Sequence, residues 1–281
     1  RKRGTGHGGI TVRTLLLCLI ALAGVVDRCH ATGYWIQANP PELVIGHPQN
    51  LTVTASGLPV GASDYVCSFR TDIVNPLRGE FEARTSPLRV ISPTLALCEA
   101  PAWDLPAVSS TLEILKSDSL VPKDGAPVTV AFLPIISGLH PARGPASGGL
   151  PLTLSGRGFD PEHGAVYTAS FEGIGGRVAS SPPCLALPGY QQIVCSTPRW
   201  HFPAGDTIVR VYLGEDLILS DAPSSFTFDA SCDAFSRTAA PSGAPRNLTI
   251  SGAGFSRDRQ ALCEFSAGGS DGGGAVEVVV R

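Results

Sequence analysis

Short runs of alternating apolar and polar residues recur along this chain, and glycine and proline bound each run. At 152–155 leucines alternate with threonine and serine, and a glycine turn then leads to Phe159. The runs TIVRVYL at 207–213 and PVTVAF at 127–132 alternate in the same way. Alternation with a period of two gives a strand one apolar face and one polar face. The pattern therefore predicts short, half-buried strands whose corners are the glycine and proline loops.

The strand-and-turn pattern occurs three times, about a hundred residues apart. It reads LTVTASGL at 51–58, PLTLSGRGF at 151–159 and LTISGAGF at 248–255. A later segment also recurs, because Cys98 and Trp103 of the first copy align with Cys195 and Trp200 of the second. A period of this length is too long for a solenoid repeat and fits a complete β-sandwich. The chain is therefore predicted to be a tandem array of sandwich modules.

We place the module boundaries where one copy of the pattern ends and the next begins. The first module is predicted at 33–133, the second at 134–229 and the third at 230–281. The third copy is incomplete, and a module of about fifty residues cannot close a sandwich by itself. We therefore expect the native chain to continue. Between the second and third modules, 229–233 is predicted to be a short linker.

Composition supports an all-β fold and argues against a nucleic-acid partner. The 281 residues are 43% hydrophobic and 16% charged, which is enough apolar material for packed cores. The 32 glycines and 24 prolines are too many for a helical protein. The net charge is −3, and no stripe of lysine and arginine lies beyond residue 13, so the chain offers no basic field to a polyanion.

The first 31 residues have the layout of a secretory signal peptide. Basic residues at 1–3 and at Arg13 precede an apolar run at 14–26, and the small-residue site Cys29-His30-Ala31 follows. A membrane-spanning helix is the rival interpretation, but about 20 apolar residues are needed to cross a bilayer. The sequence thus predicts a secreted or cell-surface protein, and a membrane anchor could follow residue 281.

Cysteine usage agrees with export. Of the eight cysteines, six lie beyond the predicted signal: Cys67, Cys98, Cys184, Cys195, Cys232 and Cys263. An even number in an exported protein indicates disulfides, although spacing alone leaves 15 pairings. The repeat favours Cys67 with Cys98, and Cys184 with Cys195. Cys232 and Cys263 could form a third bond or pair elsewhere.

Two N-glycosylation sequons stand in the same register of the repeat. Asn50-Leu51-Thr52 opens the core strand of the first module and Asn247-Leu248-Thr249 that of the third, whereas the second has Pro151 there. Asparagine is also favoured at turns into strands, which is the alternative reason for its presence. We predict glycans on Asn50 and Asn247.

No constellation of catalytic, cofactor-binding or metal-binding residues emerges from the sequence. The run 268–272 matches G-x-S-x-G, but it lies in a glycine-rich loop with no helix after it and no downstream histidine to act as base. The acidic loop 160–163 is explained more simply as exposed loop than as a calcium site. The six histidines are scattered. The sequence therefore predicts a non-enzymatic segment with no cofactor and no metal.

The second module resembles a known family. The run at 134–159, with its G-P-x-S-G-G loop and P-L-T-L-S-G-x-G-F strand, and the C-S-T-P segment at 195–198 are similar to the IPT/TIG domain, the immunoglobulin-like fold shared by plexins and transcription factors. The third module follows the same pattern up to its end, and the first is a divergent copy with Ile45-Gly46-His47-Pro48 in place of the glycine loop. The resemblance implies tandem immunoglobulin-like sandwiches of about seven strands each.

The expected function follows from this resemblance and from export. We expect an extracellular or cell-surface protein whose modules act as spacers and interaction surfaces of the adhesion or receptor type, with an extracellular protein or glycan as partner. The alternative is an accessory, glycan-binding segment of a larger secreted enzyme. An intracellular DNA-binding use of the fold is opposed by the acidic charge balance, the signal and the sequons. Trp103 and Trp200 could anchor a partner, but repetition at one framework position favours packing.

Overall fold

The computed structural model describes residues 33–74, 80–162, 164–236 and 247–257, together with the backbone of two later strands at 263–268 and 275–280. Every regular element within these residues is a β-strand, which confirms the all-β fold. They include no helix long and apolar enough to span a bilayer. The predicted signal peptide lies outside the described residues.

Module 1 (33–133) is a sandwich whose two sheets are connected by one long strand. Its nine strands are β1 (Tyr34–Asn39), β2 (Glu42–Val44), β3 (Asn50–Ser56), β4 (Tyr65–Val74), β5 (Phe81–Ser92), β6 (Leu95–Glu99), β7 (Ser109–Lys116), β8 (Ser119–Leu120) and β9 (Val128–Leu133). They follow the order β1-β3-β6-β5-β4-β7-β9-β2, with β8 added to β7. The first half of β5 pairs with β4 and its second half with β6, so β5 passes from one layer to the other.

Module 2 (134–229) has two separate sheets. One has the order β15-β16-β12-β10-β19 and the other β11-β20-β17-β13-β14, with β18 added to β17. The strands are β10 (Ile135–His140), β11 (Arg143–Pro145), β12 (Pro151–Arg157), β13 (Tyr167–Gly173), β14 (Arg177–Ser180), β15 (Leu185–Ala186), β16 (Gln192–Ser196), β17 (Gly205–Leu213), β18 (Asp216–Leu217), β19 (Leu219–Ser220) and β20 (Ser225–Asp229). The predicted run at 207–213 lies within β17.

Module 3 (230–281) is described in part. A hairpin of β21 (Ser231–Phe235) and β22 (Ile250–Ala253) leads to a second antiparallel pair, β23 (Cys263–Gly268) and β24 (Ala275–Val280). The pairing of β21 with β22 has the same bulged register as β1 with β3 and β10 with β12. The third copy therefore opens with the same strand arrangement as the other two.

Each of the first two modules encloses its own hydrophobic core. The core of module 1 is built from inward positions of its alternating strands, such as Leu51, Val53 and Phe69. The core of module 2 uses the equivalent positions, among them Leu152, Leu154 and Phe171. The alternation that predicted the strands thus also identifies the buried face.

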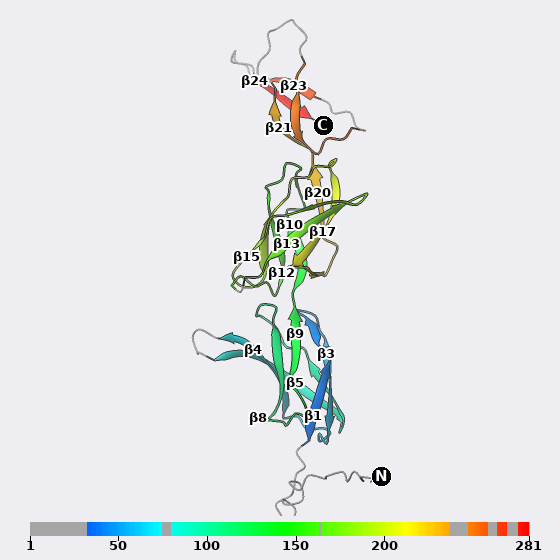
Figure 1. The fold of residues 1–281 in the computed structure, drawn as a ribbon, viewed down its shortest axis with the longest axis vertical. Helices are drawn as coiled ribbons and strands as arrows, with labels where there is room; N and C mark the ends of the chain where they lie inside the picture. Colours follow the sequence, from blue (N-terminus) through cyan, green and yellow to red (C-terminus); the bar gives the residue numbers. More distant parts are fainter. Residues whose placement is uncertain are drawn as a thin grey trace, which may run out of the picture.

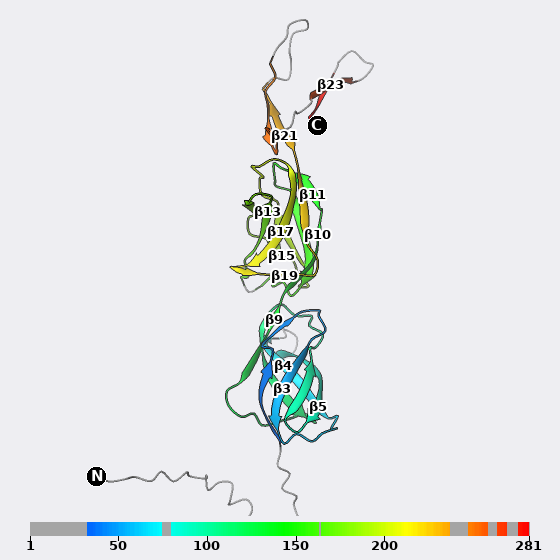
Figure 2. The ribbon, with the colours of Figure 1, turned by 90° about the vertical axis from the view of Figure 1, so that its right-hand side faces the viewer.

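The modules are joined by single residues and follow one another in a row (Figures 1 and 2). Pro134 alone separates β9 from β10, and Ala230 alone separates β20 from β21. The predicted linker at 229–233 is therefore wrong. Residues 231–233 belong to β21 because Ser231 and Cys232 pair with Ala253 and Gly252 across the hairpin.

Two disulfides fasten the strands of modules 1 and 2. Cys67 of β4 is bonded to Cys98 of β6, and Cys184, just before β15, is bonded to Cys195 of β16. These are the two pairs that the repeat favours. The first connects the two layers of module 1, whereas the second closes a short hairpin in one sheet of module 2.

Candidate functional site: the joints between modules

The loop that follows each C-x-x-P segment forms the end of a module and the start of a joint. It reads W-x-x-P-A at 103–107 and again at 200–204. The indole N–H of Trp103 donates to the carbonyl of Pro106 at 3.0 Å, and that of Trp200 to the carbonyl of Pro203 at 2.9 Å. Each indole thereby closes its loop into a tight turn with the following alanine at its end.

Both tryptophans are buried in the core of their own module. Trp103 stacks on Phe132 of β9, and Trp200 stacks on Phe228 of β20. Because β9 and β20 are the last strands of their modules, each stack lies where the chain leaves one module for the next. Repetition of these tryptophans therefore reflects packing, and neither ring is available as a surface anchor.

The alanine at the end of each loop makes a backbone hydrogen bond to the next module. The N–H of Ala107 donates to the carbonyl of Gly158 at 2.8 Å, and the N–H of Ala204 donates to the carbonyl of Gly254 at 2.8 Å. Gly158 and Gly254 are the second glycines of S-G-x-G-F in modules 2 and 3. The two joints are therefore equivalent. In each, a loop at the end of one module donates a hydrogen bond to a glycine turn of the next module.

Both acceptor glycines are needed for close approach as well as for backbone conformation. Gly158 has φ +80° and Gly254 has φ +83°, which is the left-handed region that glycine alone adopts without strain. A side chain on Gly158 would overlap Ile45 of module 1, and one on Gly254 would lie 2.8 Å from the Cβ of Ala146 of module 2. Ile45 and Ala146 are fully buried and occupy equivalent positions. The modules therefore approach each other closely at both acceptor glycines.

The joints differ in their side-chain pairs. At the first joint, Nε2 of His47 lies 2.7 Å from Oδ1 of Asp221 in the segment after β19. At the second, Arg199 pairs with Asp233 of β21 at 3.2 Å. The first joint thus holds a histidine–carboxylate pair, and the second holds an arginine–carboxylate pair.

Carboxylates gather on one side of the first joint. Burial raises the pKa of Tyr190, and the negative charges of Glu162, Asp160, Asp104 and Glu82 raise it further. A hollow of about 150 Å³ separates Tyr190 from Trp103 and Asp104 of module 1. No cluster of three or more metal-ligating side chains is found among the described residues, so these carboxylates do not converge on a cation site.

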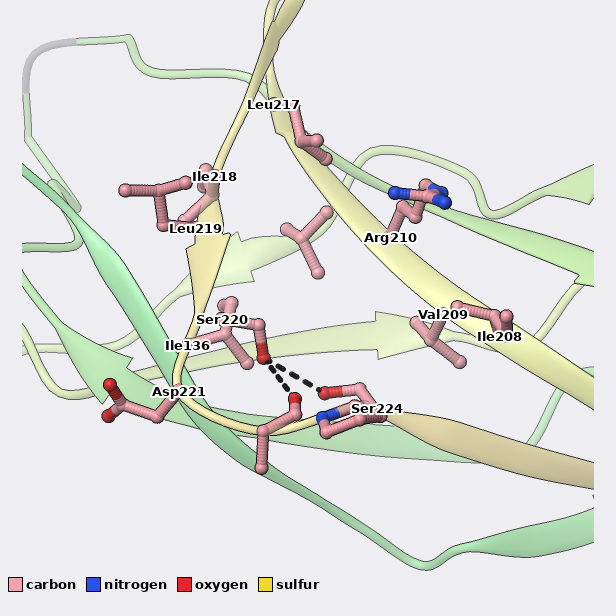
Figure 3. Close-up of a pocket in the computed structure, with 13 residues that line it drawn as sticks. Ile136, Ile208, Val209, Arg210, Leu217, Ile218, Leu219, Ser220, Asp221 and Ser224 are labelled. Carbon is pink, nitrogen blue, oxygen red and sulfur yellow. Dashed lines mark hydrogen bonds between the residues drawn. The ribbon is translucent and has the colours of Figure 1, made fainter.

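A second, more apolar hollow of about 330 Å³ lies on module 2 where the chain passes from β18 to β19 (Figure 3). Ile136, Val209 and Leu219 line it, and Ser220 Oγ donates to the carbonyl of Ala222 at its base. Asp221 lies at its edge. A hollow of about 380 Å³ occupies the equivalent place on module 1, between β7 and the segment after β8. Both hollows lie where the chain passes from one sheet to the other.

The other predicted site residues lie apart from the joints or outside the described part. Asn50 and Asn247 are both exposed. Cys232 is an exposed free thiol, whereas the side chain of Cys263 lies outside the described residues, so their pairing stays a prediction. Of the 268–272 run, only Gly268 is described, at the end of β23. Asp160 and Glu162 belong to the loop after Phe159, and His163 is outside the described residues.

Sequence reasoning did not identify the Ala–Gly hydrogen bonds or the His47–Asp221 pair. The first had a usable signal, because W-x-x-P-A and S-G-x-G-F recur at matching places and every joint needs one of each. The second had none, since the residues are 174 positions apart and neither recurs in the repeat.

Residues 134–228 match the family model of the IPT/TIG domain. No curated protein matches the chain by sequence. Among solved structures, it is similar to the extracellular region of plexin A4, with 12% identity and a TM-score of 0.28 over 67% of this chain and 27% of that one. It is also similar to the adhesin InvE of Yersinia pseudotuberculosis, with 14% identity and a TM-score of 0.28 over 70% of this chain and 59% of that one. The chain spans about a quarter of the plexin chain, and structural likeness of this degree does not bear on function.

Proposed function

We propose that this chain, of which residues 134–228 are an IPT/TIG domain, is a non-catalytic spacer and protein-interaction region of an extracellular or cell-surface protein. The observation that carries the proposal is the recurrence of one joint. Two independent joints use the same donor loop, the same acceptor glycine and a one-residue connection. A recurrent short joint sets a fixed spacing between modules, which is what a spacer requires.

The described surface supports an interaction role better than a catalytic one. The disulfides favour an oxidising compartment. Among the described residues no three metal-ligating side chains lie close enough together to hold an ion. Binding surfaces of such sandwiches are carried by loops at their ends and by exposed strands. The apolar hollow of module 2 and the hairpin tip at Ile174, which is 88% exposed, are the described places where contact with a partner protein would bury apolar area.

The spacer role is tested by opening the first joint with a single substitution. Valine at position 158 would be strained by the left-handed backbone and would overlap Ile45, so Gly158→Val should open the first joint. Gly138→Val is the matched control, because Gly138 lies in β10 with open space around its Cα. Small-angle scattering of the whole chain should show a single elongated shape for wild type and control, and a broader distribution of dimensions for Gly158→Val. A wild type as broadly distributed as the Gly158→Val variant would exclude a rigid spacer.

A further inference from the structure

Module 1 carries a third acceptor turn of the kind that builds the two joints. In the repeat, Gly57 stands where module 2 has Gly158 and module 3 has Gly254. Its φ is +76°, close to the +80° and +83° of the two joint glycines. A Cβ on Gly57 would lie 3.6 Å from the Cα of Gly33, and one on Gly158 would lie 3.3 Å from the Cα of Pro134 at the equivalent position. The turn therefore has the conformation and the backbone neighbour of an acceptor turn.

The carboxylate beside the acceptor turn is repeated as well. The N–H of Asp124 donates to the carbonyl of Trp35 at 2.9 Å, and in module 2 the N–H of Asp221 donates to the carbonyl of Ile136 at 2.9 Å. Asp221 contacts His47 of the preceding module. Asp124 holds the same place on module 1 and is exposed. A module docked on this end of module 1 would therefore meet a carboxylate where module 1 meets Asp221.

The turn at Gly57 differs from the other two in being uncovered. Gly158 and Gly254 are buried and accept hydrogen bonds from the preceding modules, whereas Gly57 is exposed, and none of the described residues donates to its carbonyl. Gly57 directly follows β3, at the end of module 1 that lies farthest from module 2 (Figure 1). A hollow of about 410 Å³ lined by Gly57, Tyr65 and Leu120 opens beside it, and Leu120 is 65% exposed. This end of module 1 thus offers a backbone acceptor next to apolar surface.

We propose that the turn at Gly57 is a docking surface for the end of an IPT/TIG-type module of a partner chain, whose W-x-x-P-A loop donates a hydrogen bond to the Gly57 carbonyl. The two joints define this occupant, because such a loop covers the same turn in modules 2 and 3. The loops at 103–107 and 200–204 already donate within the chain, so neither is free in a second wild-type copy. The partner class refines the proposed interaction role, on which it rests.

A copy of the whole chain with a released donor loop serves as the probe. Gly158→Val should free the loop at 103–107, and Gly57→Val in the same chain keeps the probe from binding itself. The double variant is isotope-labelled and titrated with unlabelled wild-type chain, and the amide resonance of Ala107 is followed. It should shift saturably, with half-saturation below about 1 mM, because a closed joint must bind more tightly than the millimolar effective concentration of a short tether. The Ala204 resonance should not shift, because the second joint stays closed.

Two unlabelled variants used in place of the wild type separate docking from backbone strain. Gly57→Val should cause no shift. Gly61→Val should act like the wild type, because Gly61 also has a left-handed backbone, with φ +80° and open space around it, but does not belong to the turn.

Three results would overturn the proposal. The first is no shift with the wild type, as would follow if residues 1–32 of the chain covered the turn. The second is an equal response to Gly57→Val and Gly61→Val. The third is an Ala107 amide that exchanges as slowly in the double variant as in the wild type. A wild type with broadly distributed dimensions in scattering that still shifts Ala107 would remove the spacer role and keep the docking surface.

Discussion

Trp200 lies face to face with Phe228, with 4.8 Å between the ring centroids and 5° between the ring planes. Trp103 and Phe132 repeat this arrangement at 3.5 Å and 8° in module 1. Each stack connects the loop that donates the joint hydrogen bond to the last strand of the same module. The packing of the core therefore positions the joint. We expect a substitution that disrupts the stack to weaken the joint as well.

We expect Trp200→Ala to destabilise module 2 by about 3–5 kcal/mol, since it removes a large buried ring, leaves a cavity and breaks the hydrogen bond to Pro203. The free energy of unfolding is measured by calorimetry or circular dichroism. Tryptophan fluorescence is unsuitable for this variant, because the remaining tryptophans, Trp35 and Trp103, both lie in module 1. Ile174→Ala is the control: that side chain is exposed, and its loss should change stability by less than about 0.5 kcal/mol. Similar losses in the two variants would contradict the structural role of the stack.

The strands were predictable from the sequence because buried and exposed positions alternate along each of them. Leu152 and Leu154 point inward while Thr153 and Ser155 do not, and alternation alone reveals this. The linker was wrong because alternation cannot show where pairing starts: β21 is mostly exposed, and only its register against β22 makes it a strand. The Ala107–Gly158 contact depends on how two modules meet, which local pattern does not encode. The repeat encodes it indirectly, through the matching positions of Ala204 and Gly254.

The two disulfides should differ in their contribution to stability. The cysteines of the first are 31 residues apart and those of the second 11. If each bond acts by restricting the unfolded chain, removing the Cys67–Cys98 bond by a double alanine substitution should cost about 3.7 kcal/mol, and removing the Cys184–Cys195 bond about 2.8 kcal/mol. Denaturant titration of the transitions of modules 1 and 2 measures both. The reverse order would show that chain entropy is not the deciding effect.

Glycans on Asn50 and Asn247 are expected in protein secreted from a eukaryotic cell. Asn50 and Thr52 are two residues apart on β3, so their side chains share a face of the strand, and Asn50 is exposed. Intact mass before and after treatment with an amidase that removes N-glycans should fall by two glycans in the wild type and by one in Asn50→Gln or Asn247→Gln. Thr52→Ser is the control, because it keeps the sequon. An unmodified wild-type mass would contradict both sites and would weaken the proposal that the chain is exported.

Tyr167 should make module 2 sensitive to strongly alkaline conditions. Burial of its ring raises the pKa of Tyr167, and the hydrogen bond that its hydroxyl oxygen accepts from the backbone N–H of Asp160, at 2.8 Å, offsets this only in part. The folded state therefore holds the phenol proton more tightly than the unfolded state does. The resulting stabilisation is fully present below the unfolded pKa, about 10, and is lost as the pH rises through the folded pKa.

The free energy of unfolding of Tyr167→Phe, compared with that of the wild type from pH 8 to 11, isolates this effect. Below pH 10 the variant should be less stable by about 1 kcal/mol, because the Asp160 N–H loses its acceptor. Above pH 10 the difference should shrink, since the wild type loses stability that the variant cannot lose. Tyr34→Phe, at a partly exposed ring of module 1, controls for the removal of a phenol. A difference that stayed constant to pH 11 would mean that ionisation of Tyr167 is not coupled to unfolding of module 2.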